Sequence, residues 1–333
     1  MWTRLFRSRA RLIRIVLPAV VGVSAVLGAG VIATGKPAAA QSGPAADRYV
    51  DIASVPRSAL PAIEPDASTG TYTEDCGRNR NGHLNADNLV VSPGVRGSAH
   101  HVHDYVGNVS TNYLSSNSEL AAAGTTCVGG DRSTYYWPVL RRLDRMGSDA
   151  HAVGGGLDDN MGRILTPSSV VIDFRGNPVS KVVAMPRFLR LVTGDPVALY
   201  TGDANVRAQW GCSGFQDRFT TKYTLCPQGS GPTRTLDFPS CWDGLSTDSA
   251  DHRTHVVFPA VDGVCPHATF AIPQLRVTLT YALSPGVPYA VDSFPEEKHD
   301  PRTDHGMFID VMTDRQMSVL VGCLNDRRHC RAS

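Results

Sequence analysis

The chain has 333 residues, eight cysteines and a formal net charge of +1, with 42% hydrophobic and 19% charged residues. This length suffices for one large domain with a substantial core. Without the six basic residues of the predicted leader described below, the net charge is −5, and such a mildly acidic chain argues against nucleic acid as a partner, because phosphate binding needs a basic face.

The first 40 residues have the three parts of a secretory signal peptide. Basic residues gather between Arg4 and Arg14, an apolar run covers 15–33, and Ala38-Ala39-Ala40 supplies small residues for cleavage. Cleavage after Ala40 would remove six basic residues and leave a net charge of −5. The run is nearly long enough to span a bilayer, so a retained anchor is the alternative. The sequence predicts a secreted or extracytoplasmic protein without a stable membrane span after cleavage.

All eight cysteines follow the predicted leader. An even number of cysteines in an exported protein indicates four disulfides, although eight cysteines allow about 105 pairings. The spacing favours local pairs: Cys212–Cys226, Cys241–Cys265 and Cys323–Cys330, with Cys76–Cys127 remaining. A thiolate zinc site is the rival interpretation, and the absence of any C-x-x-C disfavours it.

Residues 41–70 are rich in Ala, Pro, Ser and Asp and predict an extended linker, of which Ile52, Val55, Leu60 and Ile63 could pack onto the body. From residue 71 to 333 the pattern is that of a single β domain. Short runs of branched and aromatic residues predict strands over 88–91, 102–109, 135–140, 169–174, 188–192, 208–212 and 275–281. Helices are predicted only over 117–123 and 313–320. We therefore expect a mainly β fold, an antiparallel β-sandwich or jelly roll with few short helices and disulfide-stapled loops.

The stretch from Ala99 to Asn108 concentrates chemistry, with His100, His101, His103 and Asp104 inside five positions. If the stretch is a strand, His101 and His103 project from one face. Two neutral imidazoles on one face form half of a metal site, or the start of an acid/base site.

Two later clusters could supply the other half. The first is Asp243 followed by Asp251-His252-x-x-His255, in a loop that Cys241 and Cys265 would close. The second is Asp304-His305 near the C-terminus. A carboxylate beside a histidine is the usual partner of a metal ligand or general base, and Asp104, Asp251 and Asp304 could each orient a ring.

These residues define the predicted site. The metal ligands would come from His101, His103, His252, His255 and His305, and zinc or copper would suit such ligands. The residues proposed for catalysis are His101, His103, Asp104, Asp243, Asp251 and His255. The metalloprotease H-E-x-x-H, the hydrolase G-x-S-x-G and the phosphate-binding P-loop are all absent from the sequence.

The order of these clusters resembles the domain of unknown function 1996 family, which comprises secreted proteins of fungi and actinobacteria. The matching segments are 91–94, 99–108, 136–140, 238–244, 248–259, 305–308 and 323–325. The leader resembles the actinobacterial type in its long Arg-rich start and Ala-rich end. The resemblance implies a secreted single domain and, by association with wall proteins, a polysaccharide partner; it implies no reaction and no established catalytic residue.

Three hypotheses follow from the sequence. The first is a hydrolase or lyase acting on envelope or environmental polysaccharide, with His101, His103 and His255 holding a metal or sharing acid/base work. In it Asp104 and Asp251 orient the rings and Asp243 contacts substrate. The second is a binding module that holds a glycan or a metal without catalysis. The third is a buried polar network that only stabilises the fold.

Overall fold

The computed structural model describes residues 43–333, which belong to one unit. The predicted signal peptide over 1–40, and with it the alternative of a retained anchor, lies outside the described residues. Within residues 43–333, no helix is long and apolar enough to cross a bilayer.

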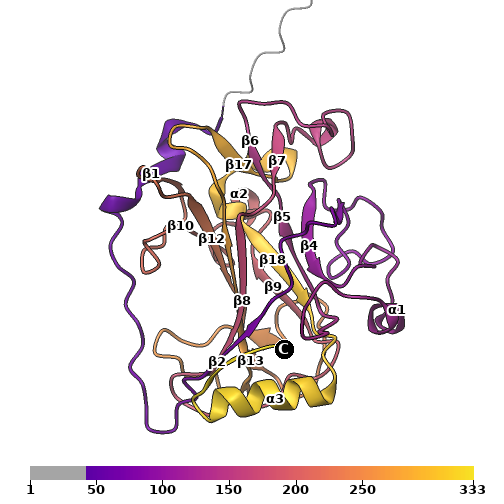
Figure 1. Cartoon of the computed structure of the whole chain (residues 1–333), viewed down its shortest axis with the longest axis vertical. Helices are drawn as coiled ribbons and strands as arrows, with labels where there is room; N and C mark the ends of the chain where they lie inside the picture. Colours follow the sequence, from indigo (N-terminus) through magenta and orange to yellow (C-terminus); the bar gives the residue numbers. More distant parts are fainter. Residues whose placement is uncertain (1–42) are drawn as a thin grey trace, which may run out of the picture. The chain divides into compact units, whose positions relative to one another are not determined.

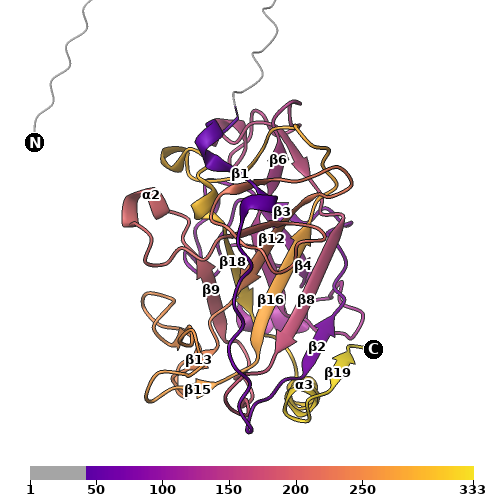
Figure 2. The same cartoon turned by 90° about the vertical axis from the view of Figure 1, so that its left-hand side faces the viewer.

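The larger of two main sheets has six strands in the order β10-β12-β16-β8-β2-β19. Its strands pair antiparallel, except that β19 runs parallel to β2. Figure 2 shows β16, β8 and β2 side by side. The bounds are β2 (Thr71–Glu74), β8 (Ser169–Arg175), β10 (Gln209–Cys212), β12 (Pro232–Asp237), β16 (Gln274–Thr280) and β19 (His329–Arg331).

The second main sheet has five antiparallel strands in the order β3-β4-β5-β18-β9. Its central strands β4, β5 and β18 are buried at every position. The bounds are β3 (Leu84–Asn85), β4 (His103–Gly107), β5 (Thr134–Pro138), β9 (Arg190–Gly194) and β18 (His305–Ile309).

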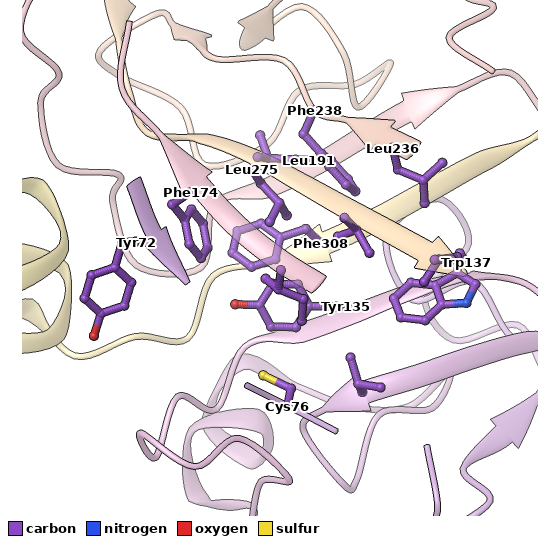
Figure 3. Packing of buried hydrophobic residues seen from close by; sticks show 14 of the residues in the cluster. Tyr72, Cys76, Tyr135, Trp137, Phe174, Leu191, Leu236, Phe238, Leu275 and Phe308 are labelled. Atoms are coloured by element: carbon purple, nitrogen blue, oxygen red, sulfur yellow. The ribbon is translucent and has the colours of Figure 1, made fainter. Parts of the chain in front are cut away.

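The two sheets face each other across one apolar core, to which Phe174, Leu236 and Leu275 contribute from the six-stranded sheet. Tyr135 and Phe308 meet them from the five-stranded sheet, and their rings pack 4.9 Å apart (Figure 3). In β16, apolar residues are buried at alternate positions, as the sequence pattern predicts for a half-buried strand. The predicted mainly β, sandwich-like fold is confirmed.

The five-stranded sheet is covered on its other face as well. A second core, which includes Leu89, Val90, Leu120, Tyr105 and Tyr136, lies between this outer face and the segments 86–102 and 108–125 on either side of β4 (Figure 1). Strands β4, β5 and β18 therefore form a middle layer with no solvent-exposed face.

Three small sheets complete the strands of residues 43–333, in the orders β17-β6-β7, β14-β13-β15 and β1-β11. Their bounds are β1 (Tyr49–Asp51), β6 (Leu140–Arg142), β7 (Arg163–Leu165), β11 (Tyr223–Leu225), β13 (Cys241–Trp242), β14 (Val256–Val257), β15 (Phe270–Ala271) and β17 (Tyr289–Val291).

Helices are few and short, as predicted. Capping boxes at Ser116 and Thr313 start α1 (Asn117–Ala122) and α3 (Asp314–Asn325), and α3 extends beyond the predicted range. Figure 1 shows α3 crossing the end of the fold near β2. The remaining helix is α2 (Ala198–Thr201), and the 3₁₀ turns are η1 (Ala46–Arg48), η2 (Ile52–Ser54), η3 (Gly156–Asp158), η4 (Pro295–Glu297) and η5 (Pro301–Thr303).

The four disulfides have the pairing that the spacing favours: Cys76–Cys127, Cys212–Cys226, Cys241–Cys265 and Cys323–Cys330. The described residues include no free cysteine. The thiolate zinc interpretation is therefore wrong.

Two segments differ from the sequence expectation. Residues 88–91 form a turn and not a strand, because the Asn88 side chain accepts a hydrogen bond from the Val91 amide at 3.1 Å. Part of the predicted linker packs onto the domain: β1 pairs with β11, and Ile52 is completely buried.

Candidate metal centre

The alternation of side chains along β4, β5 and β18 selects the residues of the outer face. Val106, Tyr135 and Phe308 point into the core between the sheets. Residues an odd number of positions away along each strand therefore point outward. This places His103 of β4 and His305 of β18 on the outer face, and His101 precedes His103 by two residues.

The three histidines meet on that face. The Nε2 atom of His101 lies 3.1 Å from Nε2 of His103 and 3.2 Å from Nε2 of His305. All three rings are at most 1% exposed. Their ligand atoms lie within 4.8 Å of one another, close enough to share one metal ion.

Backbone carbonyls determine which ring nitrogens carry hydrogen. His103 Nδ1 lies 2.9 Å from the Asp87 carbonyl and His305 Nδ1 lies 2.7 Å from the Thr303 carbonyl. A carbonyl only accepts, so both Nδ1 atoms donate and both Nε2 atoms present a lone pair. His101 Nε2 carries at most one hydrogen and can donate a linear hydrogen bond to only one of them, so at least one of the two short contacts has no linear hydrogen bond across it.

A metal ion between the rings would give each Nε2 lone pair a partner. For zinc bonds of about 2.05 Å in a tetrahedral arrangement, neighbouring nitrogens are separated by about 3.3 Å. The two contacts of His101, 3.1 and 3.2 Å, are close to this value. His101 Nδ1 is also buried without a hydrogen-bond partner of normal geometry in residues 43–333. The donor set fits Zn²⁺ or copper, both of which bind imidazole.

The surroundings keep the three imidazoles neutral. Burial lowers the pKa of His103 to about 3 and that of His305 to about 4 from the ordinary value of 6.5. Burial, with the neighbouring His103 and His305, also lowers the pKa of His101 well below 6.5. Neutral imidazole is the form that binds metal, so the fold holds the ligands ready at neutral pH.

Local sequence explains how β18 carries its ligand. A Cβ on Gly306 would lie 2.9 Å from Leu236 Cδ1 of the facing sheet, so glycine allows β18 to approach β12 closely. On β5, Pro138 pairs with His103, and continuing the register of β18 brings His305 beside Pro138 from the other side. The two histidines thus flank a compact proline and lean toward each other above it.

An aromatic ring closes the centre from outside. The Phe294 ring stands edge-on to the His101 ring, with 5.4 Å between centroids. The same ring lies 5.7 Å from His100, whose side chain is 54% exposed and pairs with Asp158. Phe294 therefore separates the buried centre from a solvent-exposed histidine.

A family model covers the region that contains all three histidines. The model, described as Domain of unknown function (DUF1996), matches residues 88–306, about two thirds of the chain. The chain belongs to this family. No curated protein and no solved structure matches the chain. The predicted family is thereby confirmed, and the family description supplies no reaction.

Within this DUF1996 domain, Asp104 and Asp304 do not contact the three rings. Asp104 points away from the outer face, because it is one residue from His103, and it accepts a hydrogen bond from Asn79. Burial raises its pKa to about 7. Asp304 forms a completely buried ion pair with Arg234. The orienting groups of His103 and His305 are backbone carbonyls instead.

The second predicted cluster lies in a separate loop over 248–255. His255 bonds to the Ser249 hydroxyl at 2.9 Å and to the Arg190 carbonyl of β9 at 2.6 Å. His252 pairs with Asp248 at 2.9 Å. The structure does not bring these two histidines into the three-histidine group.

The carboxylates of that cluster shape the backbone. Asp251 accepts hydrogen bonds from the amides of Arg253 and Thr254 and from two hydroxyls, which lower its pKa. Asp243 accepts from the amides of Leu245 and Ser246. Both carboxylates thus serve turns of the loop in this structure.

Sequence reasoning missed the groups that act through backbone atoms or from distant loops. Asp87 and Thr303 contribute carbonyls, which carry no residue signature. Phe294 resembled any other partly buried aromatic residue. Arg253 was overlooked between two histidines, although its Nη2 donates to the Gly194 carbonyl beside His305.

Proposed function

We propose that this domain is an extracytoplasmic metal-binding protein in which His101, His103 and His305 hold one transition-metal ion, zinc or copper. The observation that carries the proposal is the approach of three neutral Nε2 atoms, at least two of which present lone pairs. Four disulfides are consistent with an oxidising compartment outside the cytoplasm.

Loading the protein with metal tests this proposal directly. Purified protein is stripped with chelator and loaded with Zn²⁺ or Cu²⁺, and bound metal is counted by elemental analysis. We expect one ion per chain for the wild type and for His267→Gln, which changes an exposed histidine outside the group. His305→Gln should bind at least tenfold more weakly, as removal of one ligand predicts. Circular dichroism of the stripped proteins verifies folding.

Two results would contradict the proposal. One is a stripped, folded wild type that takes up no stoichiometric metal. The other is a His305→Gln protein that binds as tightly as the wild type.

A catalytic form of the proposal rests on the number of ligands. The group contains three histidines, and a metal with three protein ligands keeps a fourth position for water or substrate. A hydrolase or lyase acting on polysaccharide would use that position, whereas burial of the rings favours binding without catalysis. Release of new reducing or unsaturated ends by the loaded wild type, and its loss in His305→Gln, would identify the enzyme.

A further inference from the structure

A cavity of about 290 Å³ lies at the edge of the five-stranded sheet. Its lining includes apolar side chains of Val192, Val256 and Phe258 and two guanidinium groups, those of Arg207 and Arg253. The cavity therefore offers apolar contacts together with convergent polar groups, a combination that small-ligand sites use.

The cavity is on the same face of the sheet as the three histidines. Val192 of β9 pairs with Met307 of β18, and Gly194 pairs with His305. Directly paired residues point to the same face, so the Val192 side chain is on the His305 side. Two residues of a strand span about 7 Å, which sets the scale of the separation along β9.

Arg253 bridges the cavity and the centre. Its Nη2 donates to the Gly194 carbonyl at 2.8 Å, at the residue that pairs with His305. A ligand group bound to Arg253 would therefore lie next to the metal ligands.

The two arginines carry positive charge that no ion pair within residues 43–333 neutralises. Arg207 donates to the carbonyls of Ala204 and Val206 and stacks on Phe258, 4.6 Å from the ring centroid. Burial lowers the pKa of Arg253, and the charges of Asp195 and Asp251 nearby oppose this shift only in part. Both oxygens of Asp195 accept hydrogen bonds elsewhere, from the Val197 amide and the Thr201 hydroxyl.

Hydrogen bonds of the loop over 248–255 hold Arg253 in place. His255 fastens the loop to β9 through the Arg190 carbonyl, and Asp251 accepts the Arg253 amide at 3.0 Å. This gives the Asp251-His252-x-x-His255 motif a role without metal binding, because its polar groups position the arginine between the two histidines.

We propose that this cavity binds the carboxylate of an acidic sugar, with Arg253 and Arg207 holding the carboxylate and Phe258, Val192 and Val256 contacting the ring. Guanidinium groups pair with carboxylates in a planar, two-pronged geometry, which suits this ligand class. The inference deepens the proposed function by naming the ligand beside the metal centre, and the cavity itself needs no metal.

The test is calorimetric titration of the full protein with galacturonate, galactose and inorganic phosphate, with and without bound Zn²⁺. We expect galacturonate to bind at least tenfold more tightly than galactose, which differs by the carboxylate. Arg253→Gln and Arg207→Gln should each lose at least tenfold in affinity. Arg253→Lys should retain part of it, and Arg145→Gln, at an exposed site elsewhere, should match the wild type.

The outcomes separate the two proposals. Equal binding of galacturonate and galactose, or affinities unaffected in both glutamine variants, would overturn the acidic-sugar site. Arginine-dependent binding of phosphate without any binding of galacturonate would also overturn it. Arginine-dependent binding of galacturonate by a protein that takes up no metal would support the cavity while the metal proposal fails. Thermal unfolding of each variant establishes that it is folded.

Discussion

Gly306 has only a hydrogen atom in place of a side chain, which allows β18 to pack closely against the facing six-stranded sheet. A Cβ there would lie 2.9 Å from Leu236 and 3.3 Å from Phe238, both in the core. Gly306→Val should therefore destabilise the fold by about 1–3 kcal/mol, the usual cost of overpacking. Denaturant unfolding measures the change. Gly322→Val, where a Cβ meets nothing within 4 Å, is the control for adding a branched side chain.

Glu74 is a residue whose charge opposes folding. Burial, followed by the charges of Asp131 and Asp75, raises its pKa to about 8 from 4.5, and its Oε2 is buried without a partner. Between pH 4.5 and 8 the folded chain binds a proton at Glu74 that the unfolded chain lacks. Stability therefore falls as pH rises through this window, and the full cost is present above pH 8.

Glu74→Gln should remove that cost. We expect the variant to gain more stability at pH 9 than at pH 5, relative to the wild type, because glutamine carries no charge at either pH. Denaturant unfolding at both pH values measures the difference, and Glu64→Gln at an exposed site serves as control. An equal effect of Glu74→Gln at pH 5 and pH 9 would refute the linkage.

At the level of elements, the sequence predicts the strands whose alternation or aromatic content is strong. Strands at 103–107, 134–138, 169–175 and 274–280 match the expected segments closely. The segment 88–91 misleads because Leu89 and Val90 are apolar to cover the outer face of a sheet, not to pair within one. The apolar pattern of a sequence indicates that a residue is buried, but it does not indicate which element of the fold covers that residue.

The same limit applies to the site. The i and i+2 spacing brings His101 and His103 together, and the prediction named His305 as a possible third ligand. It could not separate His305 from His252 and His255, because that choice depends on which strand lies beside β5. In the structure β18 pairs with β5, whereas the loop over 248–255 is attached to β9 through His255.

The two histidine elements should therefore respond differently to substitution. We expect His255→Gln to keep one metal ion per chain and to weaken binding of galacturonate, because the loop that carries Arg253 loses its attachment to β9. His103→Gln should lose metal instead. Elemental analysis and calorimetry on the same samples measure both properties. Loss of metal in His255→Gln would show that His255 is a metal ligand, as the sequence prediction included it.

For the molecule as a whole, the neutral histidines impose an acid limit. The pKa values of His103 and His305, about 3 and 4, lie below the unfolded value of 6.5, so below pH 6.5 the unfolded chain binds more protons. The two groups therefore cost no stability above pH 6.5, and the free energy of unfolding falls as the pH decreases from 6.5 to the folded pKa values of about 4 and 3.

Bound metal should add stability over the pH range in which the folded imidazoles are neutral. Ions that bind only the folded chain raise the unfolding temperature, and protons compete with them for imidazole. Because the folded pKa values of His103 and His305 are about 3 and 4, we expect a rise with excess Zn²⁺ at pH 7.5 that is retained at pH 5 and shrinks toward pH 4. Thermal unfolding of stripped and loaded protein measures it. Loss of the whole rise at pH 5 would contradict the lowered pKa values, and His305→Gln should show little rise at pH 7.5 or at pH 5.

Because the three-histidine centre lies on the middle layer of strands, metal binding there should affect how readily the fold opens. Strand β18 carries His305 on one face and Phe308, in the core of the sandwich, on the other. An ion that ties β18 to β4 would therefore restrain the opening of the sandwich itself. Amide hydrogen exchange would register this as slower exchange across β4, β5 and β18 in loaded protein, with α2 unaffected. Because β18 belongs both to the three-histidine centre and to the core of the sandwich, metal binding at the centre would determine how often the sandwich opens.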